Sequence, residues 1–335
     1  MTKKRNCSID IFRYLAAILV VALHTTPFME FSPIISYFFS QVLPRIAVPF
    51  FFTVSGFYYS SKLENGCGSL KSVIGKLLIP YTLWSFVYFS LDYITYGSVN
   101  FFAAIKKFLF YGSAYQLWFI PSLIFSCIVT TCLYRFGRGK FLLILSGLMY
   151  LFGCLGNAYG RIGDHITFIS AIIHDPQWPW ISNFVIMGLA FFNCGVLLKK
   201  TEPRWIEWNS TKQKLILILC AGLYLTEIIV IKILDIAESI TITLSMYGLV
   251  FVLVGFLMKH PFSQQKKLAE CCRVLSNYIY YSHVMFLILI DHIISEYLGL
   301  SISATFQFFL IIFLTHLGGI LIYRSKKKWL RVWAS

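Results

Sequence analysis

The sequence predicts an all-α integral membrane protein, a bundle of about ten transmembrane helices with both termini in the cytoplasm. Of its 335 residues, 58% are hydrophobic and only 13% are charged, whereas a soluble domain carries about 25% charged residues. The hydrophobic residues form long blocks, and the lysines and arginines concentrate in alternate connections between these blocks. Together these observations exclude the soluble, disordered and fibrous classes.

The apolar blocks have the length that a membrane span requires, which is about 20 residues. Residues 34–44, ahead of the second span, and 100–110 are expected to lie in the membrane interface as helices. We expect one membrane domain over residues 1–335, with an uncleaved first helix, since no small-residue cleavage site precedes Pro27. The expected spans are 11–28, 46–61, 77–96, 117–134, 141–157, 181–198, 214–231, 240–258, 275–291 and 303–323.

The distribution of basic residues sets the expected orientation. With the N-terminus inside, the cytoplasmic segments hold 23 lysines and arginines, beginning with Lys3, Lys4 and Arg5, and the outer loops hold 5. This asymmetry is what the positive-inside rule predicts. The net charge of +15 then faces the anionic inner leaflet, so the lipid bilayer is the expected partner and nucleic acid is not.

The nine cysteines predict neither disulfides nor a metal site. Most of them lie inside apolar runs, no two form a CxxC pair, and Cys271 and Cys272 are adjacent rather than spaced as metal ligands. A buried cysteine commonly acts as a small hydrophobic residue.

The first span holds two ionisable residues on one face. Arg13 and His24 are 11 residues apart, which is 20° past three helical turns and a rise of about 16 Å. A histidine in the outer half of a span is suited to act as a general base, and an arginine near the cytoplasm to bind phosphate. The alternatives are an arginine that reaches the lipid headgroups and a histidine that bonds a backbone carbonyl.

Basic and small residues around the second and third spans form a further set. Arg45 is expected at the outer boundary, as a substrate contact or an interfacial anchor. Ser55 and Gly56 interrupt a bulky run, which is typical of close helix packing, and Ser55 is also a candidate substrate contact. Lys76 opens the third span as a candidate phosphate ligand or a positive-inside anchor.

Two later segments add aromatic and histidine candidates. Trp118, in YQLWFIPSLI, is a candidate substrate contact or a member of the interfacial aromatic belt. Tyr281 and His283, in NYIYYSHVMF, are expected near the cytoplasmic end of the ninth span, where His283 lines the same vestibule as Arg13 or caps its helix. For His316 we expect core packing.

The segments IDIFRYLAAILVVALHTT, RIAVPFFFTVSGFYY, LWFIPSLI and YIYYSHVMF occur in the order of the motifs of the acyltransferase-3 family of bacterial membrane proteins, which the chain therefore resembles over nearly its whole length. The resemblance implies transfer of an acetyl group from cytoplasmic acetyl-CoA to a hydroxyl of a cell-surface glycan or its precursor, in the bacterial cytoplasmic membrane. By that resemblance His24 is the catalytic histidine and Arg13 its partner.

The resemblance extends to the other candidates, with one departure. Acetyl-CoA is then expected at Arg13, Lys76 and His283, and the substrate at Arg45, Ser55, Trp118 and Tyr281, with no metal. The family often has an Arg-x-x-Arg pair before the third helix, where this sequence has Val73 and Lys76.

A second branch of the same superfamily leaves a transporter open. The membrane portion of the vancomycin-resistance serine racemases is similar in its RxAVPFFF, LWxxPxLI and GVLxxK motifs, and GVLLKK occurs here at 195–200. That similarity implies uptake of a small molecule such as serine. Against a carrier, the spans contain no paired carboxylates and no matched broken helices.

Overall fold

The computed structural model describes residues 6–63, 67–98, 100–260, 265–325 and 327–334, and every regular element in these ranges is helical. Lys3, Lys4 and Arg5 lie outside the described residues. The chain divides into two compact units, described separately below. Unit 1 comprises residues 1–47, 74–121 and 261–335, and unit 2 comprises residues 48–73 and 122–260.

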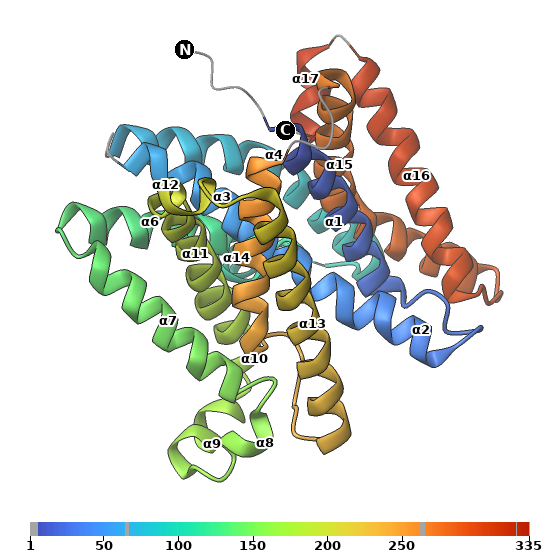
Figure 1. Cartoon of the computed structure of the whole chain (residues 1–335). Helices are drawn as coiled ribbons and strands as arrows, with labels where there is room; N and C mark the ends of the chain where they lie inside the picture. The colour runs from blue at the N-terminus through green and yellow to red at the C-terminus, as the bar shows by residue number, and fades with distance from the viewer. Residues whose placement is uncertain (1–5, 64–66, 99, 261–264, 326, 335) are drawn as a thin grey trace. The chain divides into compact units, whose positions relative to one another are not determined.

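The helices of unit 1 come from both ends of the chain and from its second quarter (Figure 1). They are α1 (Cys7–Thr25), α2 (Pro33–Tyr37), most of α4 (Cys67–Tyr96), α5 (Phe101–Lys106), α15 (Lys266–Ile290), α16 (Ala304–Arg324) and α17 (Lys328–Arg331).

The helices of unit 2 are continuous in sequence apart from the first. They are most of α3 (Ala47–Leu63) and of α6 (Phe119–Arg135), then α7 (Gly139–Leu155), α8 (Gly160–Gly163), α9 (Thr167–Ile173), α10 (Trp178–Trp180), α11 (Gly188–Lys200), α12 (Glu202–Ile206), α13 (Ser210–Leu234) and α14 (Leu244–Lys259).

The all-helical membrane class is confirmed. Among the described residues, seven helical segments are long and apolar enough to cross a membrane, and each overlaps one of the expected spans. The three remaining expected spans coincide with the shorter apolar helices α6, α7 and α14. The count of ten spans, the single domain and the cytoplasmic termini stay predictions.

The segment expected as a separate interfacial helix at 34–44 instead runs without a break into the second span. The chain is helical from Pro33 to Leu63, passing through a π-helical turn (Phe38–Val42) and a 3-10 turn (Leu43–Ile46). Pro44 lies in the 3-10 turn, and because proline has no N–H, the helix changes its hydrogen bonding there rather than ending.

The core of unit 1 is the packing of α1 against α15 and α16. Ala17 and Val21 of α1 meet Leu275 and Ile279 of α15 and Ile311 of α16. The small alanine at position 17 lets the helix backbones approach closely, as is usual where helices pack in a membrane. Figure 1 shows α1 in blue beside α15 and α16 in orange and red.

Hydrogen bonds between Glu30 and Thr305 join the end of α1 to the start of α16. Glu30 accepts hydrogen bonds from the Thr305 hydroxyl at 2.6 Å and from its backbone N–H at 3.2 Å, and Phe28 N–H donates to the same hydroxyl at 2.7 Å. These donors, the Thr305 hydroxyl foremost, lower the pKa of Glu30 to about 2. A carboxylate at a helix N-terminus also complements the helix dipole.

We expect Glu30→Gln to destabilise the protein at neutral pH but not in acid. Because the folded state holds Glu30 ionised, its contribution is complete above the ordinary carboxyl pKa near 4.3 and is lost as pH falls toward about 2. Thermal unfolding of both proteins between pH 7 and 3 measures this. If the difference in melting temperature between the two proteins does not become smaller below pH 4.5, the ionised Glu30 carboxylate does not stabilise the protein through these hydrogen bonds.

The centre of unit 2 is the crossing of α3 and α11 at two glycines. A Cβ atom added to Gly56 would lie 1.9 Å from the Phe192 carbonyl oxygen, and one added to Gly195 would lie 1.9 Å from the Thr53 carbonyl oxygen. The Thr53 hydroxyl donates to the Phe191 carbonyl at 3.1 Å. Gly56 therefore lets the backbones of α3 and α11 approach closely, as the sequence analysis expected.

Candidate functional site

The first and ninth expected spans run side by side in the same direction in unit 1. Ser276 of α15 donates from its hydroxyl to the Arg13 carbonyl of α1 at 3.0 Å. Further along both helices, the ring of His24 on α1 lies against the ring of His283 on α15. The structure thus places His283 beside His24, more than two turns beyond Arg13, whereas the sequence grouped His283 with Arg13.

His24 stands in a group of polar aromatic side chains at the end of α1. Its half-buried ring lies 4.9 Å from the Tyr115 ring at 64° and 5.4 Å from the His283 ring at 25°, between centroids. The Arg45 guanidinium, in the same unit, donates to Gln41 Oε1 at 2.8 Å. We call His24, Tyr115 and His283 the His24 cluster.

His283 is fixed in orientation and almost completely buried. Its Nδ1 lies 2.7 Å from the carbonyl oxygen of Ile279, one turn earlier in α15, and only 1% of the residue is exposed. A carbonyl can only accept, so Nδ1 donates and Nε2 of the neutral ring is an acceptor. That Nε2 atom is buried without a hydrogen-bond partner in the described part of the chain.

The hydroxyl of Tyr88, from α4, bonds two backbone groups of α15. It donates to the Tyr281 carbonyl at 2.7 Å and accepts from the Met285 backbone N–H at 3.1 Å. These two groups are four residues apart and are the pair that ordinarily bond each other in an α-helix. The two bonds fasten α4 to α15 on the face opposite His283, since residues two positions apart point to opposite sides of a helix.

The same hydroxyl also accepts a hydrogen bond from the Gln116 side chain. Gln116 Nε2 donates to Tyr88 Oη at 2.6 Å, and because the Tyr88 proton is already given to a carbonyl, the amide must donate here and its Oε1 points elsewhere. Oε1 is buried and, within the described ranges, lacks a partner. Gly112, with φ +83°, allows the tight turn before this residue, since a Cβ there would lie 2.4 Å from the Trp118 nitrogen.

We expect Tyr88→Phe to loosen the His24 cluster and to destabilise the protein by roughly 1–3 kcal/mol. The substitution removes one hydroxyl that serves Gln116, Tyr281 and Met285. The last two can bond each other within α15, so the buried Gln116 amide is the group that is left unpaired. Thermal unfolding in detergent measures the loss. Tyr323→Phe, whose hydroxyl makes one exposed bond to the Lys267 carbonyl, is the matched control and should change little.

The other predicted site residues lie as follows. Tyr281 is buried in unit 1, with its ring stacked 6.0 Å from that of Trp84 at 3°. Trp118 is half-buried two residues after Gln116, and Lys76 is exposed on α4. Ser55 belongs to unit 2, where its hydroxyl donates to the Phe51 carbonyl of its own helix at 2.7 Å. The roles assigned to all of them stay predictions.

Tyr88, Tyr115 and Gln116 are the members of this region that the sequence analysis missed. Each lies inside a segment that reads as an ordinary span or an interfacial aromatic stretch. A glutamine directly before LWFIP is a polar residue at the edge of a span, and that was the available signal.

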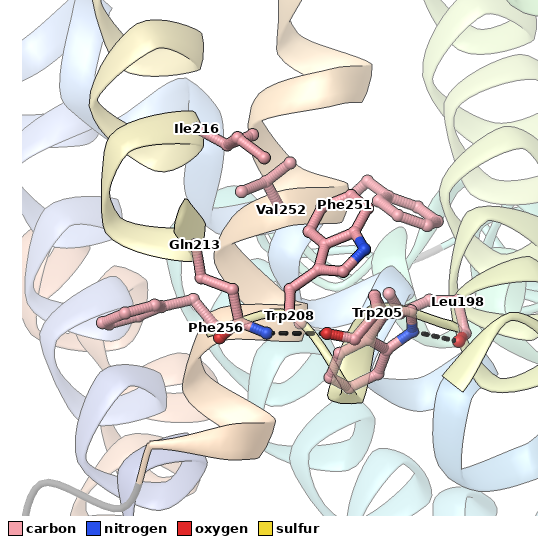
Figure 2. Close-up of a pocket in the computed structure, with 9 residues that line it drawn as sticks. Leu198, Trp205, Trp208, Gln213, Ile216, Phe251, Val252 and Phe256 are labelled. Atoms are coloured by element: carbon pink, nitrogen blue, oxygen red, sulfur yellow. Dashed lines mark hydrogen bonds between the residues drawn. The ribbon is translucent and has the colours of Figure 1, made fainter. Parts of the chain in front are cut away.

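Two cavities are lined by described residues of unit 2. The smaller, of about 30 Å³ (Figure 2), is mostly apolar and water-sized. In it Gln213 Nε2 donates to the Trp205 carbonyl at 2.8 Å and Trp205 Nε1 to the Leu198 carbonyl at 2.9 Å. The larger, of about 490 Å³, carries amino and hydroxyl groups suited to an anion and is lined by Ser60, Ser61, Leu63, Tyr134, Lys199 and Lys200.

The fold and the His24 cluster define a helical membrane protein in which two histidine rings lie against each other on neighbouring spans. Comparison with known families identifies the family to which the chain belongs. The family model described as "Acyltransferase domain" matches residues 6–324, and the chain belongs to this acyltransferase-3 family. No solved structure matches the chain.

The similar curated proteins carry racemase names. An amino-acid racemase of Enterococcus faecalis is 26% identical over 340 aligned positions, covering 97% of this chain and 47% of that protein. A serine/alanine racemase of Enterococcus gallinarum is 28% identical over 212 positions, covering 60% of this chain and 30% of that protein. The chain therefore spans less than half the length of these relatives.

Proposed function

We propose that this protein is a membrane O-acyltransferase that moves an acetyl group from cytoplasmic acetyl-CoA to a hydroxyl of a cell-surface glycan or its precursor. The observation that carries the proposal is the His24 cluster, found in a chain of the acyltransferase-3 family. The positive-inside distribution supports a cytoplasmic membrane location with both termini inside.

His24 is the general base in this proposal. A ring nitrogen of His24 accepts the proton of the glycan hydroxyl while the hydroxyl oxygen forms a bond to the thioester carbonyl carbon. The carbon–sulfur bond then breaks, and His24 returns the proton to the departing sulfur, which leaves an ester and a free thiol. General-base assistance contributes about 10²- to 10⁴-fold to such a step.

Arg13 and Arg45 supply the positive charge that this reaction requires. In this proposal Arg45 stabilises the negative charge that develops on the carbonyl oxygen. Arg13, toward the start of α1, is suited to bind the donor phosphates, with Lys76 as a second cation and Trp118 and Tyr281 as substrate contacts. Guanidinium groups match a donor that carries phosphates and a carbonyl oxygen.

Calorimetry of acetyl-CoA binding to the purified protein in detergent tests the donor. We expect specific binding that Arg13→Ala weakens by about 10- to 100-fold, since a charged hydrogen bond contributes roughly 1.5–3 kcal/mol. Arg273→Ala, which removes an arginine beside Glu270 at 3.9 Å on the surface of the same unit, is the control. Absence of binding to a folded sample contradicts the acyltransferase.

The second candidate is a transporter of an amino acid such as serine, and it is suggested by relatives whose names give amino acids as what they act on. In that case Arg13 binds the carboxylate of the transported molecule. Saturable uptake of labelled serine into proteoliposomes, in a protein that does not bind acetyl-CoA, supports the transporter. Serine uptake equal to that of empty liposomes rejects it.

A further inference from the structure

The larger cavity of unit 2 lies where three helices end. Its volume is about 490 Å³, and its lining residues belong to the last turns of α3, α6 and α11. α3 and α11 complete candidate membrane spans, and α6 is a shorter apolar helix. A membrane span ends at the level of the lipid headgroups. The cavity is therefore expected at the membrane surface, where the phosphates of the lipids lie.

The size of this cavity is that of a ligand pocket. Small-molecule pockets measure about 300–1,000 Å³, whereas one water occupies about 30 Å³. The helices that form its walls are joined to each other. Tyr59 Oη and Thr131 Oγ1 are 2.5 Å apart between α3 and α6, and the close crossing of α3 and α11 at Gly195 lies about one turn before Lys199. The cavity thus has walls of regular structure.

Two lysines at the end of α11 give the cavity its positive charge, and each lies over an aromatic ring. Lys200 Nζ is 4.3 Å from the centroid of the Tyr134 ring, and Lys199 Nζ is 5.2 Å from that of Phe57. Lys199 also bonds the Glu202 carboxylate, which neutralises one charge and uses one of the three N–H donors of that ammonium group. Within the described ranges, Lys200 has no carboxylate partner. The lysines therefore keep a net positive charge.

The end of α11 is also arranged so that its backbone opposes an anion less than a free helix end would. The last carbonyl groups of a helix carry a partial negative charge, which repels anions. Two of them are occupied here: the Leu197 carbonyl accepts from Thr201 Oγ1 at 2.9 Å, and the Leu198 carbonyl accepts from Trp205 Nε1 at 2.9 Å. The ammonium groups of the two lysines are thus the main charges that line the cavity.

We propose that this cavity binds the phosphate group of an anionic phospholipid, with Lys199, Lys200, Ser60 and Ser61 as donors. A phosphate diester is negatively charged and its oxygens accept hydrogen bonds, which matches ammonium and hydroxyl groups. Basic pockets between spans hold such headgroups in other membrane proteins. The phosphates of a soluble molecule such as coenzyme A share this chemistry, and the experiment below separates the two sources. The lipid site does not depend on the proposed reaction.

Titration of the delipidated protein in detergent with phosphatidylglycerol, followed by native mass spectrometry, tests the site. We expect the Kd of the first bound lipid to rise about 10-fold in Lys200→Gln, which loses a charged hydrogen bond, and about 3-fold in Ser60→Ala, which loses a neutral one. Lys212→Gln is the matched control, because Lys212 Nζ also lies over an aromatic ring of unit 2, that of Trp208 at 4.6 Å, but does not line the cavity. Its Kd should equal that of the wild type.

Three outcomes would overturn the proposal. If Lys200→Gln and Lys212→Gln change the Kd equally, the lipid follows the net charge of the protein and not the cavity. If the wild type binds zwitterionic phosphatidylcholine as tightly as phosphatidylglycerol, the site does not select an anion. If Lys200→Gln weakens the binding of coenzyme A, measured by calorimetry without lipid, the lipid is not the occupant. Lys200 is exposed, so its variant should fold, and Ser60→Ala repeats the test without a change of charge.

Discussion

We expect His24→Ala to abolish acetyl transfer while the protein still accumulates in the membrane. The apolar core of unit 1 is formed by Val21, Ile279 and their neighbours, and His24 is not a member of it. Loss of a general base lowers the rate about 10²- to 10⁴-fold, so we expect less than roughly 1% of wild-type transfer. Labelled acetyl ester formed on cell envelope per amount of protein measures it.

A second histidine of the same unit provides the control for that result. His316 also bonds the carbonyl four residues before it, and its Nε2 is occupied by Tyr14. His316→Ala should reduce the melting temperature and leave transfer per folded molecule near that of the wild type. If His24→Ala keeps more than a tenth of the wild-type rate, His24 is not the base.

Gly195→Ala is expected to have the largest effect on folding. The added methyl group would stand 1.9 Å from the Thr53 carbonyl oxygen and 2.6 Å from the Phe57 nitrogen, which are backbone atoms of α3 that no rotamer change can move. The two helices must separate, at a cost of roughly 3 kcal/mol. We expect a lower melting temperature and less protein in the monodisperse peak of size-exclusion chromatography.

Two glycines in open surroundings are the matched controls for this substitution. Nothing lies within 4 Å of a Cβ atom added to Gly222 in α13 or to Gly248 in α14. Alanine is the better helix former by about 1 kcal/mol, so Gly222→Ala and Gly248→Ala should leave the protein as stable or more so. A Gly195→Ala protein that behaves like these two would show that α3 and α11 do not touch there.

The sequence was sufficient for the class of protein and for the positions of its helices. Long apolar blocks with few charges have one stable solution in a bilayer, which is the helix. The stretch 34–44, expected as an interfacial helix ahead of the second span, is continuous with that span, because Pro44 is accommodated in a 3-10 turn. Helical periodicity placed Arg13 and His24 on one face, since both belong to one helix.

Helical periodicity does not predict which side chains of different helices lie together. His283 was grouped with Arg13 from its expected depth alone, whereas the structure sets its ring against His24. Tyr88 and Gln116 gain their significance from bonds to α15, far along the chain. The sequence of an apolar span does not show that the hydroxyl of one of its tyrosines bonds the backbone of another helix.

The hydrogen bonds between the Tyr88 hydroxyl and the backbone of α15 have a consequence for the biogenesis of the protein. Tyr88 and Tyr281 are 193 residues apart, which corresponds to about 10–40 s of translation at roughly 5–20 residues per second. Throughout that interval α4 is in the membrane without the helix that receives its hydroxyl. Nascent chains that end before α15 therefore carry His24 and Tyr115 without His283, and the pair of histidine rings forms only after α15 has been made.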